Sequence, residues 1–293
     1  MTVEEFRAPE RLFKYLSPAR IGILTDQLIR YTPMGAFNDP FEGRPEIKGV
    51  ASNEATLSSF AEAIPGELEV AYNCLPTEVR ARFPLQQWIQ SATPLMQKQQ
   101  GQFLAMLGAL SKQLIATIPN KLDDVLGVLS LCEVPNSLLM WAHYAASHTG
   151  FVLELDPRHP YFNTRRSDQD ECGHIRQVSY RDVRPSANLT DLGGTEMFLV
   201  KSKEWSYECE WRVLRPLKDA QHIVASNGEK IHLFELPPDS IKAVILGARA
   251  STTITDQARL AISTNSNMSH IQLLRCIPDE SCFAINIVAD GNR

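Results

Sequence analysis

Apolar and polar residues recur with two different periods along this chain, which separates strand-like from helix-like segments. Residues 12–16 are mostly apolar and predict a strand or the end of a helix, and Pro18 favours a helix over residues 17–28. Residues 29–33 predict another strand. From 52 to 124, Ala, Gln, Leu and Met dominate and apolar residues recur every three or four positions, which predicts helices.

Strand signals return after the helical segment. Residues 125–134 form an apolar run typical of a buried strand, and residues 150–156 alternate as a strand does. Residues 136–148 lie between these two segments and predict a helix, with Asn136 or Ser137 as its N-cap. Further strands are predicted at 174–181, 207–215, 231–236 and 243–247. A last helix is predicted at 255–263, before the segments 270–277 and 282–288.

The arrangement of these signals predicts the fold class. Because strand signals flank the helical segment on both sides, we expect one α+β domain over residues 1–293, with residues 52–124 as a helical insertion within it. Its core is expected to be a mixed or split antiparallel sheet. Hydrophobic residues make up 44% of the chain and charged residues 22%, as in globular proteins with a large core.

Charge and cysteine content narrow the class of protein. The net charge is −5 and Lys and Arg are scattered, so nucleic-acid binding is not indicated. The N-terminal residues lack the features of a secretory signal, and no apolar run reaches the roughly 18 residues of a membrane span. The six cysteines form no CxxC pair. We therefore expect a cytoplasmic protein with no membrane partner and no bound metal.

A first polar motif is FNDPFE at residues 37–42. Its spacing is that of a helix start, with Asp39 as N-cap, Pro40 as the first helical residue and Glu42 completing a capping box. The two phenylalanines would then pack on either side of the turn. In the alternative interpretation, polar groups of this loop such as Asn38 contact a ligand.

A second motif is MWAHY at residues 140–144, followed by His148. His143 and His148 are five positions apart, so on a helix they point roughly 140° away from each other and would not bind the same metal ion. Trp141 and Tyr144 fit either a core position or a place beside a ligand.

The third motif, residues 205–213, predicts a strand with two different faces. Glu208, Glu210 and Arg212 share one face. Neighbouring carboxylates repel each other, and such pairs often have one raised pKa, as acid–base sites do. Alternatively, Arg212 and a lysine neutralise them in an exposed ion-pair ladder. The lysine that neutralises the carboxylates would be Lys201 or Lys203. The opposite face of the strand would carry Trp205, Tyr207, Cys209, Trp211 and Val213.

Four segments together resemble an uncharacterised bacterial family known as a domain of unknown function. They are LFKYLS at 12–17, FNDPFE at 37–42, MWAHYAASHTGFVLELD at 140–156 and KEWSYECEWRV at 203–213. This resemblance covers most of the chain but implies no particular activity.

The order of the motifs also resembles that of ADP-ribosyltransferases, which use NAD as a substrate. That resemblance implies that Glu210 is the catalytic carboxylate, which stabilises positive charge on the ribose, and that Glu208 orients the acceptor or a water molecule. The early NAD-contacting position would be Lys14 or Tyr15, where the family usually has Arg or His. The family's serine-threonine-serine signature is absent from this chain, and Ser130 is its only approximate counterpart. Further cofactor-binding residues would be Tyr144 or Trp141 near the nicotinamide, His143 at a ribose or phosphate, and Asn38 and Arg212.

Three functions follow from these motifs. The first is an enzyme that transfers ADP-ribose from NAD or hydrolyses NAD. The second is a non-enzymatic module that binds a ligand or partner through the same residues. The third is a nuclease or other hydrolase that uses His143, His148 and the carboxylates. The sequence assigns neither an acceptor nor an oligomeric state.

Overall fold

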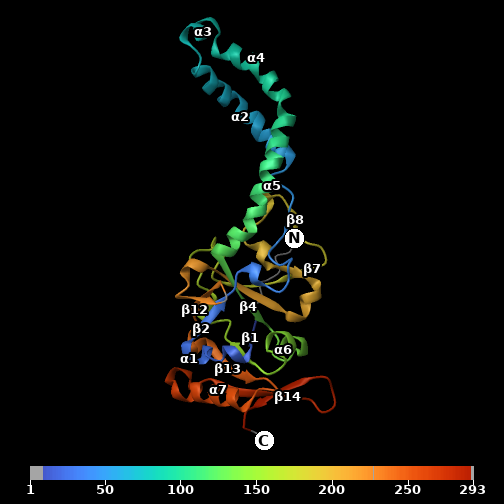
Figure 1. The fold of residues 1–293 in the computed structure, drawn as a ribbon, viewed down its shortest axis with the longest axis vertical. Helices are drawn as coiled ribbons and strands as arrows, with labels where there is room; N and C mark the ends of the chain where they lie inside the picture. Colours follow the sequence, from blue (N-terminus) through green and yellow to red (C-terminus); the bar gives the residue numbers. More distant parts are fainter. Residues whose placement is uncertain (1–8, 227, 292–293) are drawn as a thin grey trace. The chain divides into compact units, whose positions relative to one another are not determined.

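The computed structural model describes residues 9–226 and 228–291 and contains a mixed sheet of eight strands (Figure 1). Its order is β15-β14-β13-β5-β1-β4-β10-β6, in which β13 and β14 are parallel and all other neighbours antiparallel. The predicted α+β class is confirmed. The strands are β1 (Leu12–Leu16), β4 (Leu126–Cys132), β5 (Phe151–Leu155), β6 (Ile175–Gln177), β10 (Glu210–Pro216), β13 (Ile241–Leu246), β14 (Gln272–Pro278) and β15 (Ile285–Ala289).

The other strands form three smaller sheets. They are β11 (His222–Ser226), β12 (Glu229–Glu235) and β2 (Leu28–Tyr31) in one sheet, β3 (Glu46–Ile47) with β8 (Ser186–Ala187), and β7 (Ser179–Arg181) with β9 (Val200–Ser202). The helices are α1 (Ile23–Asp26), α2 (Asn53–Asn73), α3 (Thr77–Arg82), α4 (Leu85–Lys98), α5 (Gln100–Val125), α6 (Leu138–Tyr144) and α7 (Thr252–Thr264). Among the described residues, no helix combines the length and apolar character needed to cross a membrane.

The chain divides into two compact units. The helical unit consists of residues 45–120 and 185–193, and the sheet unit contains the remainder. In the helical unit, Trp88 of α4 donates its indole N–H to the Leu68 carbonyl of α2 (3.0 Å), and Phe60 stacks on Phe103 with 4.4 Å between ring centroids. These contacts join helices that carry few buried side chains.

In the sheet unit, the large sheet is covered on both faces. Alternation along β13 places Val244 and Leu246 in one apolar cluster with residues of α7, and Ile245 in another with residues of α6. Trp141 of α6 is fully buried and donates its indole N–H to the Pro135 carbonyl at 2.8 Å. The strands are therefore largely apolar because both of their faces are covered.

Two predicted helices are shorter than expected. In place of a helix over residues 17–28 there is a 3-10 turn at Pro18–Arg20 and then α1, which ends where Gln27 adopts a left-handed φ of 57°. The predicted helix over residues 136–148 is confirmed only as α6, with Ser137 as its N-cap. It ends early because Ala146, Ser147 and His148 all have positive φ values.

The predicted strand over residues 205–213 is wrong in its first half. Lys203–Glu208 forms a 3-10 helix, Cys209 has a left-handed φ of 44°, and β10 begins only at Glu210. Pairing explains the boundary, because the ladder between β10 and β4 starts at Glu210 opposite Cys132. Within residues 9–226 and 228–291, no strand of the large sheet pairs with the alternating residues before that position.

Gly150 directly precedes β5 and lies against the end of β1. A Cβ atom at this position would lie 2.1 Å from the Leu16 carbonyl oxygen and 3.1 Å from the Ala145 carbonyl oxygen. We expect Gly150→Ala to lower the free energy of unfolding by about 1–3 kcal/mol, because backbone atoms must shift to admit the methyl group. Urea unfolding measures this, with Gly66→Ala as control, since a Cβ at Gly66 of α2 meets nothing within 4 Å. Equal stability of both variants would contradict the prediction.

Candidate functional site

A cavity of about 310 Å³ lies in the sheet unit beside β1 and β4. Its wall combines aromatic and charged side chains from β1, β2, the loop after β2, β4, α6 and residues 201–210. Its volume is at the lower end of the roughly 300–1,000 Å³ typical of ligand sites. The aromatic residues in the wall are Phe13, Tyr15, Phe37, Tyr144 and Trp205.

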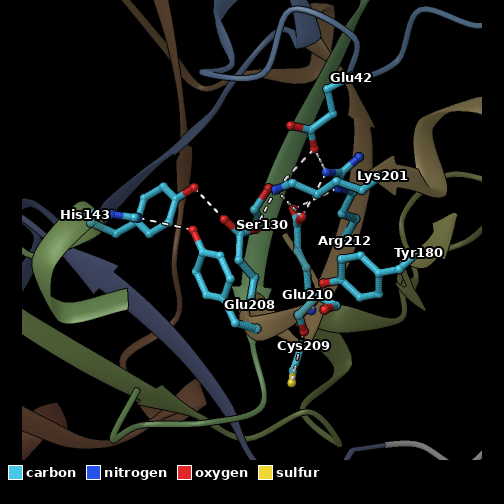
Figure 2. A network of polar contacts seen from close by, with 12 residues as sticks. Glu42, Ser130, His143, Tyr180, Lys201, Glu208, Cys209, Glu210 and Arg212 are labelled. Carbon is cyan, nitrogen blue, oxygen red and sulfur yellow. Dashed lines mark hydrogen bonds and ion pairs between the residues drawn. The ribbon is translucent and has the colours of Figure 1, made fainter. Parts of the chain in front are cut away.

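Three carboxylates and two cations form a buried network in and behind this wall (Figure 2). The carboxylates are those of Glu42, Glu208 and Glu210, and each of these residues is no more than 3% exposed. The Lys201 ammonium donates to Glu208 and, at 3.0 Å, to Glu210, and it lies 3.5 Å from the Glu42 carboxylate. The side chain of Lys201 therefore holds all three carboxylates together.

Arg212 is fully buried behind Glu210. Its Nε and Nη2 atoms donate to the two Glu210 oxygens at 2.8 and 2.9 Å, which is a bidentate pair. Its Nη2 atom also contacts Glu42, and its Nη1 atom donates to the Phe198 carbonyl at 2.6 Å. The guanidinium lies 5.5 Å from the centre of the Phe37 ring. These contacts fix the orientation of the Glu210 carboxylate.

Strand alternation explains only part of this arrangement. Glu210 and Arg212 share a face of β10, as predicted, and Trp211 points into the opposite core. Glu208 instead reaches the network from the end of the 3-10 helix, where Tyr144 donates a 2.6 Å hydrogen bond to it. The predicted aromatic face is wrong at Trp205, which lines the cavity below the Lys201 ammonium.

The alternative prediction of an exposed ion-pair ladder is wrong about exposure. Arg212 and Lys201 do pair with the carboxylates, but all of these groups are buried. Lys203 instead faces Asp182 at 3.5 Å, on the surface.

The FNDPFE segment forms a turn and no helix, so the predicted capping box is wrong. Asp39 accepts a 2.9 Å hydrogen bond from the Phe41 amide, as an Asp in a turn commonly does. Glu42 is then directed towards Lys201 and Arg212 (Figure 2). Phe37 is partly buried against an apolar cluster, whereas Phe41 is 58% exposed. The prediction that the two rings pack on either side of a helix start is therefore wrong.

Burial and charge set the protonation of the network. Burial alone would lower the pKa of Lys201, but Glu210 and Glu208 outweigh it and hold that pKa above its ordinary value. Burial raises the pKa of Glu210, and Lys201 opposes this rise. Burial raises the pKa of Tyr144, as does its hydrogen bond to Glu208, so this phenol remains a donor at neutral pH. The network contains three carboxyl groups and two basic side chains, and the buried Asp39 lies in the same wall.

The structure brings six of the nine predicted catalytic and cofactor-binding residues to the cavity wall. They are Glu210, Glu208, Lys14, Tyr15, Asn38 and Tyr144. Arg212 lies behind the wall, and Trp141 is in the core. His143 is exposed and forms a 3.1 Å hydrogen bond with the Tyr207 hydroxyl (Figure 2). His148 stacks on Trp141. The two histidines therefore do not line the cavity with the carboxylates.

For several site residues the sequence predicts no role in a site. Its patterns assign Glu42 to a helix cap, and Lys201 only to charge neutralisation. Tyr180 accepts a 2.8 Å hydrogen bond from the Glu210 amide and so holds the start of β10. Arg30 and Asp39 also line the cavity. The signal in the sequence is that FNDPFE carries two acidic residues close to aromatic ones, which the capping pattern explains equally well.

Lys14 gives a pH-dependent prediction. Burial lowers its pKa to about 8 from the ordinary 10.5, with Glu210 opposing and Arg20 and Arg30 assisting the shift. Between these two values the unfolded chain binds more protons, so stability rises with pH across that window. We expect Lys14→Met to raise the melting temperature at pH 7, with the gain shrinking between pH 8 and 10.5. Calorimetric melting at several pH values measures this, and a pH-independent difference would contradict it.

Comparison with known proteins assigns no activity to this site. A family model described as "Protein of unknown function (DUF2971)" matches residues 140–213, a segment that runs from α6 into β10 and contains Tyr144, Lys201, Glu208 and Arg212. No curated protein and no solved structure matches the chain. Over residues 140–213 the chain is therefore similar to a domain whose function is unknown.

Proposed function

We propose that the cavity binds NAD⁺ as a substrate and that the protein cleaves its bond between nicotinamide and ribose, either releasing ADP-ribose or transferring it. The observation that carries this proposal is the cluster of buried carboxyl groups in the wall, those of Glu42, Glu208 and Glu210, which Lys201 and Arg212 hold in place. A pyridinium ring is cationic, and the sugar becomes cationic as the bond breaks. Fixed carboxylates favour both species.

The proposed chemistry begins at the ribose carbon that carries nicotinamide. The C–N bond breaks, its electron pair goes to the ring nitrogen, and neutral nicotinamide leaves. Positive charge then develops on the ribose, where the Glu210 carboxylate, held by Arg212, stabilises it. Water or another acceptor forms the new bond to the ribose, and its proton passes to Glu208 and then to solvent. Tyr144 and Lys201 hold Glu208 for this role.

The size and lining of the cavity support part of a dinucleotide as the occupant. About 310 Å³ suits the nicotinamide and its ribose more closely than all of NAD⁺. Tyr15, Phe37 and Trp205 provide aromatic surface for a flat cationic ring. The adenosine portion would then extend from the cavity.

The test is incubation of the purified protein with millimolar NAD⁺, with nicotinamide release followed by chromatography and binding by thermal shift. We expect a raised melting temperature and nicotinamide that accumulates in proportion to the enzyme concentration. If the protein neither binds NAD⁺ nor releases nicotinamide, the proposal is wrong.

A binding module is the second candidate, favoured by one observation. Glu208 and Glu210 are already paired with Lys201 and Arg212, as in a purely structural network. The same cavity would then hold its ligand without chemistry. Binding of NAD⁺ with no nicotinamide release over a day would support this second candidate.

A further inference from the structure

The cavity also has a basic part, contributed by β1 and β2. Lys14 and Arg30 both line it. The Lys14 ammonium donates a 2.9 Å hydrogen bond to the Ser130 carbonyl, and among the described residues it has no hydrogen bond to a carboxylate. Lys14 therefore contributes a cation to the wall without a dedicated anionic partner.

Arg30 is under-satisfied in the same way. Its Nε atom is buried and has no hydrogen-bond partner in the part of the chain that the structure describes. Its Nη2 atom lies 3.9 Å from Glu229, a side chain that is 69% exposed, so this ion pair is weak. A buried N–H group without an acceptor is unfavourable, and an anionic ligand would satisfy it.

The basic side chains also repel one another. Burial lowers the pKa of Lys14, Glu210 opposes this, and Arg20 and Arg30 lower it further, so these cations are close enough to interact. Like charges gathered in a cavity wall are favoured when an anion binds among them. Arginine suits phosphate in particular, because its fork of N–H groups matches phosphate oxygens.

We propose that Arg30 and Lys14 form a phosphate-binding subsite of this cavity. The inference rests on the proposed function for the nature of the rest of the ligand. The cavity then has an acidic part at Glu208 and Glu210 and a basic part at Arg30 and Lys14. A ligand that fits both is cationic at its ring and anionic at its sugar phosphate. The substrate class is therefore a phosphorylated pyridinium nucleotide, which the site binds in preference to the unphosphorylated riboside.

The experiment is calorimetric binding of nicotinamide mononucleotide and of nicotinamide riboside to wild type and to Arg30→Met. Wild type should bind the mononucleotide about 10–100-fold more tightly than the riboside, because one or two charge-assisted hydrogen bonds to the phosphate account for a gain in affinity of that size. Arg30→Met should lose most of that preference while its affinity for the riboside stays unchanged. Lys230→Met is the matched control, because Lys230 is an exposed cation on neighbouring β12 that does not line the cavity.

The outcomes separate the subsite from the proposed function. Equal affinity of wild type for the two compounds overturns the subsite but leaves pyridinium binding intact. If neither compound binds, the proposed function fails, and inorganic pyrophosphate becomes the probe. Pyrophosphate binding that Arg30→Met weakens and Lys230→Met does not would keep the subsite, and no pyrophosphate binding would overturn it. Circular dichroism and melting of both variants confirm that they are folded.

Discussion

Glu210→Gln is expected to slow nicotinamide release from NAD⁺ by at least about a hundredfold while leaving NAD⁺ binding largely intact. Glutamine keeps the shape of the side chain, and its single oxygen, placed where Oε2 lies, can still accept hydrogen bonds from Arg212 Nη2 and Lys201. Its NH2 group cannot accept the hydrogen bond from Arg212 Nε. It removes the negative charge that would stabilise the cationic ribose, so the loss should fall on kcat more than on KM. Steady-state nicotinamide release, measured together with the NAD⁺-dependent thermal shift, provides both quantities.

Glu204→Gln is the matched control for this substitution. Glu204 belongs to the same 3-10 helix as Glu208, is exposed, and does not line the cavity. It should retain the wild-type rate. An unchanged rate in Glu210→Gln would remove Glu210 from the mechanism, whereas loss of NAD⁺ binding would assign it to binding.

Arg212→Met is expected to lower the free energy of unfolding by about 3–5 kcal/mol, because it leaves buried carboxylates without their main cation. Glu210 would lose its bidentate partner, Glu42 would lose one of its two cations, and the Phe198 carbonyl would lose its donor. This change is a large part of the roughly 5–15 kcal/mol that stabilises a typical domain. Urea unfolding at pH 7 measures it.

Two further variants make this test specific. Arg11→Met removes a surface arginine that is 56% exposed and paired with Glu154, and should change stability by only about 0–1 kcal/mol. Adding Glu42→Gln to Arg212→Met should recover part of the loss, because one uncompensated charge is removed. A loss below about 1 kcal/mol in Arg212→Met would show that the network contributes little to the fold.

Sequence patterns predicted those elements in which local periodicity and packing agree. β1, β4 and β5 are apolar because both faces of the sheet are covered, and the predictions for them are accurate to within a few residues. The segment before β10 differs because its alternation lacks a pairing strand. Its backbone turns there, and this turn directs Glu208 towards Tyr144 and Lys201.

The site could be predicted only where its residues share a motif. Glu210 and Arg212 are two positions apart on one strand, so their common face follows from strand geometry. Glu42 joins them from a loop after β2, and no local pattern indicates a contact over that separation. Its spacing from Asp39 also matched a helix cap, and the tertiary ion pair with Arg212 is what distinguishes the two interpretations.

The central position of β1 has a consequence for the order of folding. Lys14 and its hydrogen-bond partner Ser130 are 116 residues apart, and Arg11 and Glu154 are 143 apart. Contacts of such long range slow folding, because a long loop must close before they form. During synthesis, β1 leaves the ribosome long before β4 and β5, so this apolar strand stays without its neighbours in the sheet until more than 100 further residues have been translated. We therefore expect the nascent N-terminal segment to be a preferred chaperone substrate, and the sheet and its cavity to form together late in translation.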